Sequence, residues 1–150
     1  MLFSNNERLM MSTAKNNQQV KTRQRVVEHG EVFTHEREVK AMLDLVKDQT
    51  YRIDSTFLEP ACGSGNFLIE ILNRKLEVLK QKYSKSRIKY ETNLIKVAST
   101  LYGVELLEDN TLECRERLLK GIQNTYLSLV LQLKSHIANH NYRLGINHNY

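Results

Sequence analysis

The sequence predicts an α/β protein with a parallel β-sheet and flanking helices. Two short apolar segments, residues 56–59 and 101–106, alternate with longer segments whose apolar residues recur at helical spacing. Strands that alternate with helices favour parallel pairing, because a right-handed helical crossover returns the chain to the same end of the sheet. Two strands alone cannot form a covered parallel sheet, so we expect the start of such a sheet, in truncated form.

Two helices are expected before the first strand. The first, at residues 20–28, ends near Gly30, which can adopt a positive φ at little cost. The second, at residues 36–47, has Thr34 as its predicted N-cap. Its apolar residues fall at the i, i+3, i+4 and i+7 positions of an amphipathic helix, and they are Val39, Met42, Leu43 and Val46.

The remaining helices follow the two strands. A helix after the first strand should bury Leu68, Ile71, Leu72, Leu76 and Leu79. A basic connection at residues 80–89 should lead to a helix at 91–99, with Leu94, Ile95 and Ala98 pointing inward. The second strand is mostly apolar, which predicts cover on both of its faces. Residues 108–120 should be helical, helical spacing continues to Leu133, and residues 139–150 show no clear period.

Composition limits the class of protein. The chain has 150 residues, 41% of them hydrophobic, and a net charge of +5, which suits a polyanionic partner. We expect a flexible polar and basic arm at residues 1–25 and one domain at residues 26–150. No apolar run is long enough for a transmembrane helix and the N-terminus is not a secretory signal, so we expect a cytoplasmic protein with no membrane contact. Cys62 and Cys114 are too few for a disulfide framework and are expected as reduced thiols.

The most informative segment is a glycine turn at residues 57–68, Phe-Leu-Glu-Pro-Ala-Cys-Gly-Ser-Gly-Asn-Phe-Leu. A strand ends at Glu59, a loop of small residues follows, and a helix begins. Gly63 and Gly65 allow a tight turn and close approach of a ligand, at the strand ends where open α/β sheets bind ligands. Leu68 stands where a dinucleotide motif needs its third glycine, and no Gly-Lys pair follows Gly65, so two common phosphate motifs are excluded. A plain strand–helix turn remains the alternative.

This segment resembles the cofactor motif of amino-methylating DNA methyltransferases. Residues 30–34, Gly-Glu-Val-Phe-Thr, resemble the family's Gly-x-x-Phe-Thr-Pro motif, and residues 101–106 resemble its second strand with an acidic end. The matches span residues 26–120. The resemblance implies the N-terminal part of an adenine-specific (N6) DNA methyltransferase of restriction–modification type, with a truncated Rossmann-like S-adenosylmethionine-dependent fold. The order of the motifs resembles that of the subgroup that methylates adenine N6.

The resemblance also implies a set of cofactor-binding residues. Phe33 and Thr34 would lie along the methionine end of S-adenosylmethionine, Glu59 would face its ammonium group, and Glu105 would accept hydrogen bonds from the ribose. The full set is Phe33, Thr34, Glu59, Pro60, Ala61, Cys62, Gly63, Gly65, Asn66, Phe67, Glu105 and Leu106. Two features depart from the family pattern. His35 replaces a proline, and Glu105 lies 40 positions after Gly65, a spacing that fits an inserted helix.

The family's catalytic motif is missing from this sequence. Asn/Asp-Pro-Pro-Tyr/Phe holds and stacks the flipped adenine, and this chain has one proline, Pro60. We therefore assign no catalytic residue and expect a fragment that is inactive alone and meets double-stranded DNA only through the full-length enzyme. His136 and His140 lack the glutamate of a zinc motif, so no metal site is predicted.

Two alternatives to this fragment stay open. One is a non-catalytic subunit that a C-terminal polypeptide would complete as a split methyltransferase. The other is a small DNA- or cofactor-binding regulator, for which salt-dependent DNA binding without any cofactor effect would be the sign.

Overall fold

The computed structural model describes residues 23–143, with side chains from residue 25 to residue 135 except that of His29. Most of the predicted N-terminal arm and residues 144–150 of the predicted tail lie outside this range. The chain divides into two compact units, with the boundary after Leu45.

The first unit contains α2 (Arg23–His29) and α3 (Glu36–Asp44), joined by a turn at Gly30 with φ of 64°. Helix α3 buries Val39 and Leu43, as its periodicity predicts, but Met42 is 54% exposed. Two details of the prediction were wrong. The N-cap is His35 rather than Thr34, without a side-chain cap bond. The helix also ends at Asp44, where the Leu45 N–H donates to the Met42 carbonyl (3.2 Å) and tightens the last turn.

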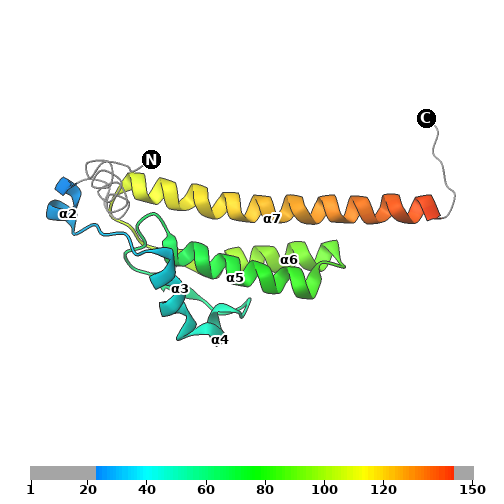
Figure 1. Cartoon of the computed structure of the whole chain (residues 1–150), viewed down its shortest axis with the longest axis horizontal. Coiled ribbons are helices and arrows are strands. Elements are labelled where there is room, and N and C mark those ends of the chain that lie inside the picture. The colour runs from blue at the N-terminus through cyan, green and yellow to red at the C-terminus, as the bar shows by residue number, and fades with distance from the viewer. Residues whose placement is uncertain (1–22, 144–150) are drawn as a thin grey trace, which may run out of the picture. The chain divides into compact units, whose positions relative to one another are not determined.

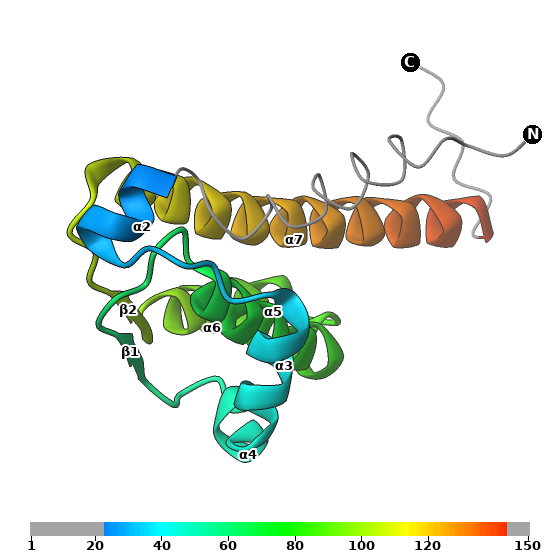
Figure 2. The same ribbon diagram turned by 60° about the vertical axis from the view of Figure 1, so that its left-hand side comes forward.

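The second unit contains a two-stranded parallel sheet and helices. Its elements are α4 (Lys47–Thr50), β1 (Phe57–Glu59), α5 (Asn66–Tyr83), α6 (Arg87–Ala98), β2 (Leu101–Gly103) and α7 (Glu108–Arg143). Strands β1 and β2 pair in parallel, with Phe57 opposite Leu101 and Glu59 opposite Gly103 (Figure 2). The described chain is thus mostly helical, with a two-stranded parallel sheet, which confirms the predicted α/β character at a coarse level.

The core of the second unit lies where α5, α6 and α7 run side by side (Figure 1). Every residue of the predicted apolar stripe on α5, from Leu68 to Leu79, is buried. The core cluster comprises Leu72, Leu76, Leu79, Tyr90, Leu94, Val97 and Leu129.

The prediction for α6 was wrong at its start and on its inner face. The helix begins at Arg87, because the basic connection ends sooner than expected. Its buried face consists of Tyr90, Leu94 and Val97, at i, i+4 and i+7. Ile95, expected inside, is 72% exposed, and Ala98 is exposed as well.

Helix α7 is longer than the sequence predicted. It continues without interruption through residues 139–143, which were expected to lie in an irregular tail. Gly121 does not break it. An added Cβ there would lie 3.3 Å from Leu72 Cδ2, so the glycine lets α7 pack closely on α5. Among the described helices, none has the length and hydropathy that a membrane crossing requires.

The two faces of the sheet have different cover. Paired residues in parallel strands point to the same face, so Phe57 and Leu101 share one face while Leu58 and Tyr102 share the other. Leu101 packs against the helical core, whereas Leu58 is 65% and Tyr102 is 53% exposed. The expectation that the second strand is covered on both faces was therefore wrong. It also ends at Gly103, and the apolar residues beyond it, Val104 and Leu106, are exposed.

A buried lysine fastens the start of both strands to α5. Lys75 has no exposed surface, and its Nζ donates to the Ser55 carbonyl and to Thr100 Oγ1 (2.6 Å for the latter). The same ammonium lies 5.1 Å from the centre of the Phe57 ring. Burial lowers the pKa of Lys75 to about 8. This side chain therefore fixes the beginning of β1 and β2 against α5. The loops that follow the two strands lie at the opposite ends of the strands.

Candidate functional site

The glycine turn forms a closed loop between β1 and α5. The Gly65 N–H donates to the Cys62 carbonyl at 2.8 Å, and Gly63 and Gly65 take positive φ values of 52° and 88°. Gly65 is also the N-cap of α5. An added Cβ on Gly65 would lie 2.5 Å from Cys114 Sγ, so glycine is needed there for space as well as for conformation.

Hydrogen bonds extend the pairing of the two strands past their ends. The Val104 N–H donates to the Glu59 carbonyl (2.9 Å), and the Cys62 N–H donates to the Val104 carbonyl (3.0 Å). This extension brings the segment after β2 beside the glycine loop. Glu105 is therefore held next to residues that lie more than forty positions earlier in the chain.

The Glu105 carboxylate bridges the two strand ends. Its Oε2 accepts a hydrogen bond from the Gly63 N–H at 2.8 Å, and its Oε1 accepts one from the Leu107 N–H at 2.9 Å. Each carboxylate oxygen has two lone pairs, so one acceptor position on each oxygen remains for a further donor. The carboxylate thus both fixes the loop and presents a pair of acceptors.

Glu59 is the second carboxylate at this edge of the sheet. It is half-buried, and burial raises the pKa of its carboxyl group. Among the residues that the structure describes, no ion pair to Glu59 is recorded. A half-buried carboxylate of this kind is better stabilised as an anion when a cation binds beside it.

Arg117 of α7 contacts this loop, and the sequence analysis did not identify it. Its guanidinium donates to the Ser64 carbonyl (2.6 Å), to Ser64 Oγ (3.1 Å) and to Asn66 Oδ1 (2.9 Å). Three such bonds tie the loop and the start of α5 to α7. Only helical spacing could have indicated this contact from the sequence. Arg117 lies three positions after Cys114 and therefore on the same side of α7.

The structure brings together some of the predicted site residues but not all of them. Glu59, Cys62, Gly63, Gly65, Asn66 and Glu105 come together at the carboxyl ends of the strands. Phe67 lies in the first turn of α5, while Pro60, Ala61 and Leu106 are exposed. Phe33 and Thr34 lie between α2 and α3 and are described with the first unit, not with the loop.

The two cysteines of the second unit, Cys62 and Cys114, are packed closely against neighbouring residues. Both are free thiols, and burial raises the pKa of Cys62 to about 11 and also raises that of Cys114. A Cβ on Gly103 would lie 2.8 Å from Cys62 Sγ, which shows how closely the thiol packs on β2. A raised thiol pKa disfavours the nucleophilic thiolate.

A cavity of about 430 Å³ extends from the glycine loop along β2 and under α7. Its walls combine apolar side chains with the polar side chains of Glu105, Thr111 and Arg115. The lining residues are Cys62, Leu68, Leu101, Gly103, Val104, Glu105, Thr111, Cys114, Arg115 and Leu118.

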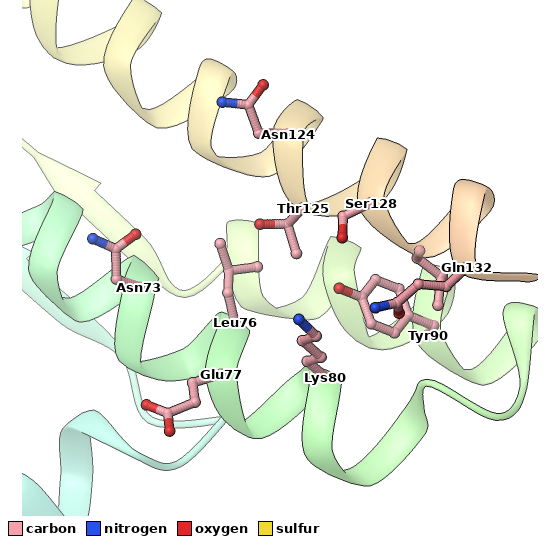
Figure 3. Close-up of a pocket in the computed structure, with 10 residues that line it drawn as sticks. Asn73, Leu76, Glu77, Lys80, Tyr90, Asn124, Thr125, Ser128 and Gln132 are labelled. Atoms are coloured by element: carbon pink, nitrogen blue, oxygen red, sulfur yellow. The ribbon is translucent and has the colours of Figure 1, made fainter.

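A second cavity, of about 380 Å³, is a groove between α5, α6 and α7. Figure 3 shows Lys80 of α5 directed toward Thr125 and Ser128 of α7, with Tyr90 of α6 nearby. Its polar groups are mostly amides and hydroxyls, spread over helix surfaces away from the strand ends. No sequence motif marked this groove, and its residues do not converge as the loop residues do.

Metal chemistry is not indicated within the described residues, which contain no group of three or more His, Cys, Asp or Glu side chains able to hold an ion. The side chains of His136 and His140 lie outside that set. Comparisons of the chain with protein-family models, with curated proteins and with solved structures gave no match.

Proposed function

We propose that this chain is the cofactor-binding N-terminal part of an S-adenosylmethionine-dependent DNA methyltransferase that acts on adenine N6. The observation that carries the proposal is the pair of carboxylates, Glu59 and Glu105, at the ends of two paired parallel strands beside a glycine loop. Ligands of open α/β sheets bind at this edge.

The residues at this edge fit the groups of the proposed cofactor. S-adenosylmethionine carries an ammonium group and a ribose diol, and when bound it supplies an electrophilic methyl group. Glu59 is half-buried and gains a cation if the ammonium binds there. Glu105 has acceptor positions left for two hydroxyl donors while it holds Gly63 in place. Arg117 keeps the loop closed from the α7 side.

Calorimetric titration of the folded chain tests the two roles separately. Glu59→Gln should weaken binding of S-adenosylmethionine but leave adenosine binding unchanged, since adenosine lacks the ammonium. Glu105→Gln should weaken both ligands by roughly tenfold or more, through loss of a charged acceptor. Glu108→Gln, an exposed carboxylate in the first turn of α7, is the control and should change neither.

Two further outcomes bear on the same assignment. Because protonation of Glu59 removes its charge, affinity for S-adenosylmethionine should fall as the pH falls through its raised pKa, while that for adenosine should not. Equal affinity in the wild type and both site variants, or no heat from a folded chain, would contradict the proposal. Methylation of DNA by the 150-residue chain itself would contradict our expectation that the catalytic residues lie elsewhere.

A second candidate is the non-catalytic half of a split methyltransferase. The specific observations that favour it are the exposed apolar sheet face of Leu58 and Tyr102 and the cavity along β2. A third strand against β2, with a helix over the open face, would fill both. Mixing the chain with a polypeptide that carries an Asn-Pro-Pro-Tyr motif should then protect the amides of residues 101–103 from hydrogen exchange. Unchanged exchange at these amides would reject this candidate.

A further inference from the structure

Two charged side chains from later parts of the chain hold neighbouring residues of the glycine loop. The Glu105 carboxylate, which follows β2, accepts the Gly63 N–H at 2.8 Å. Arg117 of α7 places its Nη1 2.6 Å from the Ser64 carbonyl oxygen. The loop is therefore held from two separate elements, by an anion on one backbone N–H and by a cation on the carbonyl of the next residue.

One guanidinium nitrogen of Arg117 contacts three oxygen atoms at the loop. Besides the Ser64 carbonyl, Nη1 lies 3.1 Å from Ser64 Oγ and 2.9 Å from Asn66 Oδ1. This nitrogen carries two hydrogens, so one can serve Asn66 at the start of α5 while the two oxygens of Ser64 share the other. Ser64 is only 5% exposed, so water has little access to these oxygens in place of the guanidinium.

The backbone of the loop needs such anchors to stay in one conformation. Gly63 and Gly65 have positive φ values, and glycine loses more conformational freedom on ordering than any other residue. The position of a Cβ on Gly65 is 2.5 Å from Cys114 Sγ, so the loop backbone lies directly against α7. Helix α7 therefore supplies both a packing surface, at Cys114, and hydrogen bonds, from Arg117, that fix the loop.

We propose that Arg117 is a positioning residue that keeps the glycine loop in its ligand-binding conformation and couples cofactor binding to the order of α7. The inference rests on the cofactor role proposed above. Without the guanidinium, the buried Ser64 carbonyl lacks a donor, and the loop opens to bring it to water. Only molecules with a closed loop bind the ligand, so the apparent affinity falls with their fraction. By linkage, a ligand that binds the closed loop also slows opening of the α7 turn that anchors it.

Amide hydrogen exchange of the unliganded chain tests the positioning role. Arg117→Met should speed exchange of the Gly63 and Gly65 amides, which donate hydrogen bonds in the closed loop, by roughly tenfold. The Phe57 amide donates to the Thr100 carbonyl at the other end of the sheet and should keep its wild-type rate. Local opening of the loop is thereby separated from a general loss of stability, which would speed exchange at all three amides.

Two further variants separate the charge of Arg117 from its reach. Arg117→Lys keeps the cation, but its shorter side chain cannot contact Ser64 and Asn66 together, so loop exchange should fall between the rates of the wild type and Arg117→Met. Lys120→Met removes an exposed cation nearly one turn further along α7 and should leave loop exchange unchanged. Wild-type exchange of the loop in Arg117→Met, or an equal acceleration at Phe57, would overturn the positioning role.

Calorimetric titration with S-adenosylmethionine, joined to exchange measurements at saturation, tests the coupling. Arg117→Met should bind this ligand roughly tenfold more weakly than the wild type. Saturating ligand should slow exchange of the α7 amides at residues 113–121 in the wild type but not in Arg117→Met. Unchanged affinity in the variant, or equal slowing in both proteins, would overturn the inference. Absence of binding to the wild type would instead contradict the proposed cofactor role, and exchange in the unliganded variants still decides whether Arg117 positions the loop.

Discussion

The two faces of the β1–β2 sheet have opposite environments although they belong to the same six strand residues. On one face, Phe57 lies beneath the Lys75 ammonium and Leu101 joins the helical core. On the other, Leu58 and Tyr102 are more than half exposed. The strands are only three residues long, so burial on the helical face must supply most of what holds them together.

The covered face of the sheet stabilises the fold of the second unit, whereas the exposed face is available for contact with other molecules. The covered face and its helices form a continuous core from Leu72 to Leu129. The exposed face contributes apolar surface that parallel sheets normally bury. Substitutions on the two faces should therefore have unequal effects on stability, and matched pairs measure the inequality.

The largest difference is expected between two leucine truncations. Leu72→Ala removes a fully buried side chain from the core and should lower the free energy of unfolding by about 2–5 kcal/mol. Leu58→Ala, on the exposed face, should change it by no more than about 0.5 kcal/mol. Urea unfolding followed by circular dichroism measures both. A comparable loss for Leu58→Ala would mean that the open face is covered in solution.

A smaller effect, with a distinct pH dependence, is expected at Lys75. Lys75→Met leaves the Ser55 carbonyl and Thr100 Oγ1 without their donor and should cost about 1–3 kcal/mol. The pKa of Lys75 is about 8 in the folded chain, below the ordinary lysine value of about 10.4 in the unfolded chain. Between these values the unfolded state binds the extra proton, so wild-type stability rises with pH through this window.

The Met variant lacks this titration, so the stability advantage of the wild type over Lys75→Met should grow from pH 8 towards pH 10. Thermal or urea unfolding of both proteins at several pH values gives the difference directly, and other titrating groups cancel. A difference that stays constant across the window would show that the Lys75 pKa is not lowered by folding.

The smallest effect is expected for two neighbouring residues of β2. A Cβ added at Gly103 would lie 2.8 Å from Leu68 Cδ1 and from Cys62 Sγ, both at the ends of side chains that can shift. Gly103→Ala should therefore cost about 1 kcal/mol through local overpacking. Tyr102→Ala, one residue earlier on the exposed face, should cost less. A larger loss in the free energy of unfolding for Tyr102→Ala than for Gly103→Ala would contradict the assignment of the covered and exposed faces.

The sequence predicted those features that depend on local pattern. The glycine turn, the strand before it and the buried stripe of α5 are visible from Gly63, Gly65 and the leucines at helical spacing. The positions of Lys75 and Arg117 were not predictable in this way, because their partners lie at least 20 positions away in the chain. From the sequence alone, a lysine within the apolar stripe of α5 is expected to be exposed. The burial of Lys75 follows only from the tertiary positions of Ser55 and Thr100, which accept its hydrogen bonds.

Errors in the prediction arose where apolar residues occupy two neighbouring faces of one helix. On α6, Val97 is buried and Ile95 is exposed, and periodicity alone could not decide between them because the choice depends on how the helix packs on α5 and α7. The covered second strand was expected because its residues are apolar, but cover depends on helices that the described part of this unit places on one face only. Glu105 was singled out as the acidic end of the second strand, but its bond to the Gly63 N–H could not be predicted without the parallel register.

The parallel register has a consequence for how this unit folds. Phe57 meets Leu101 only when the intervening segment, which contains α5 and α6, has closed into a crossover. Closing a long segment before any strand contact forms costs entropy, and such non-local pairing slows folding. The α5–α6 hairpin, whose contacts are local, should therefore form early, with the strands and the Glu105–Gly63 bond following. Ordered last, the glycine loop is also the part whose amides should open first in the native state.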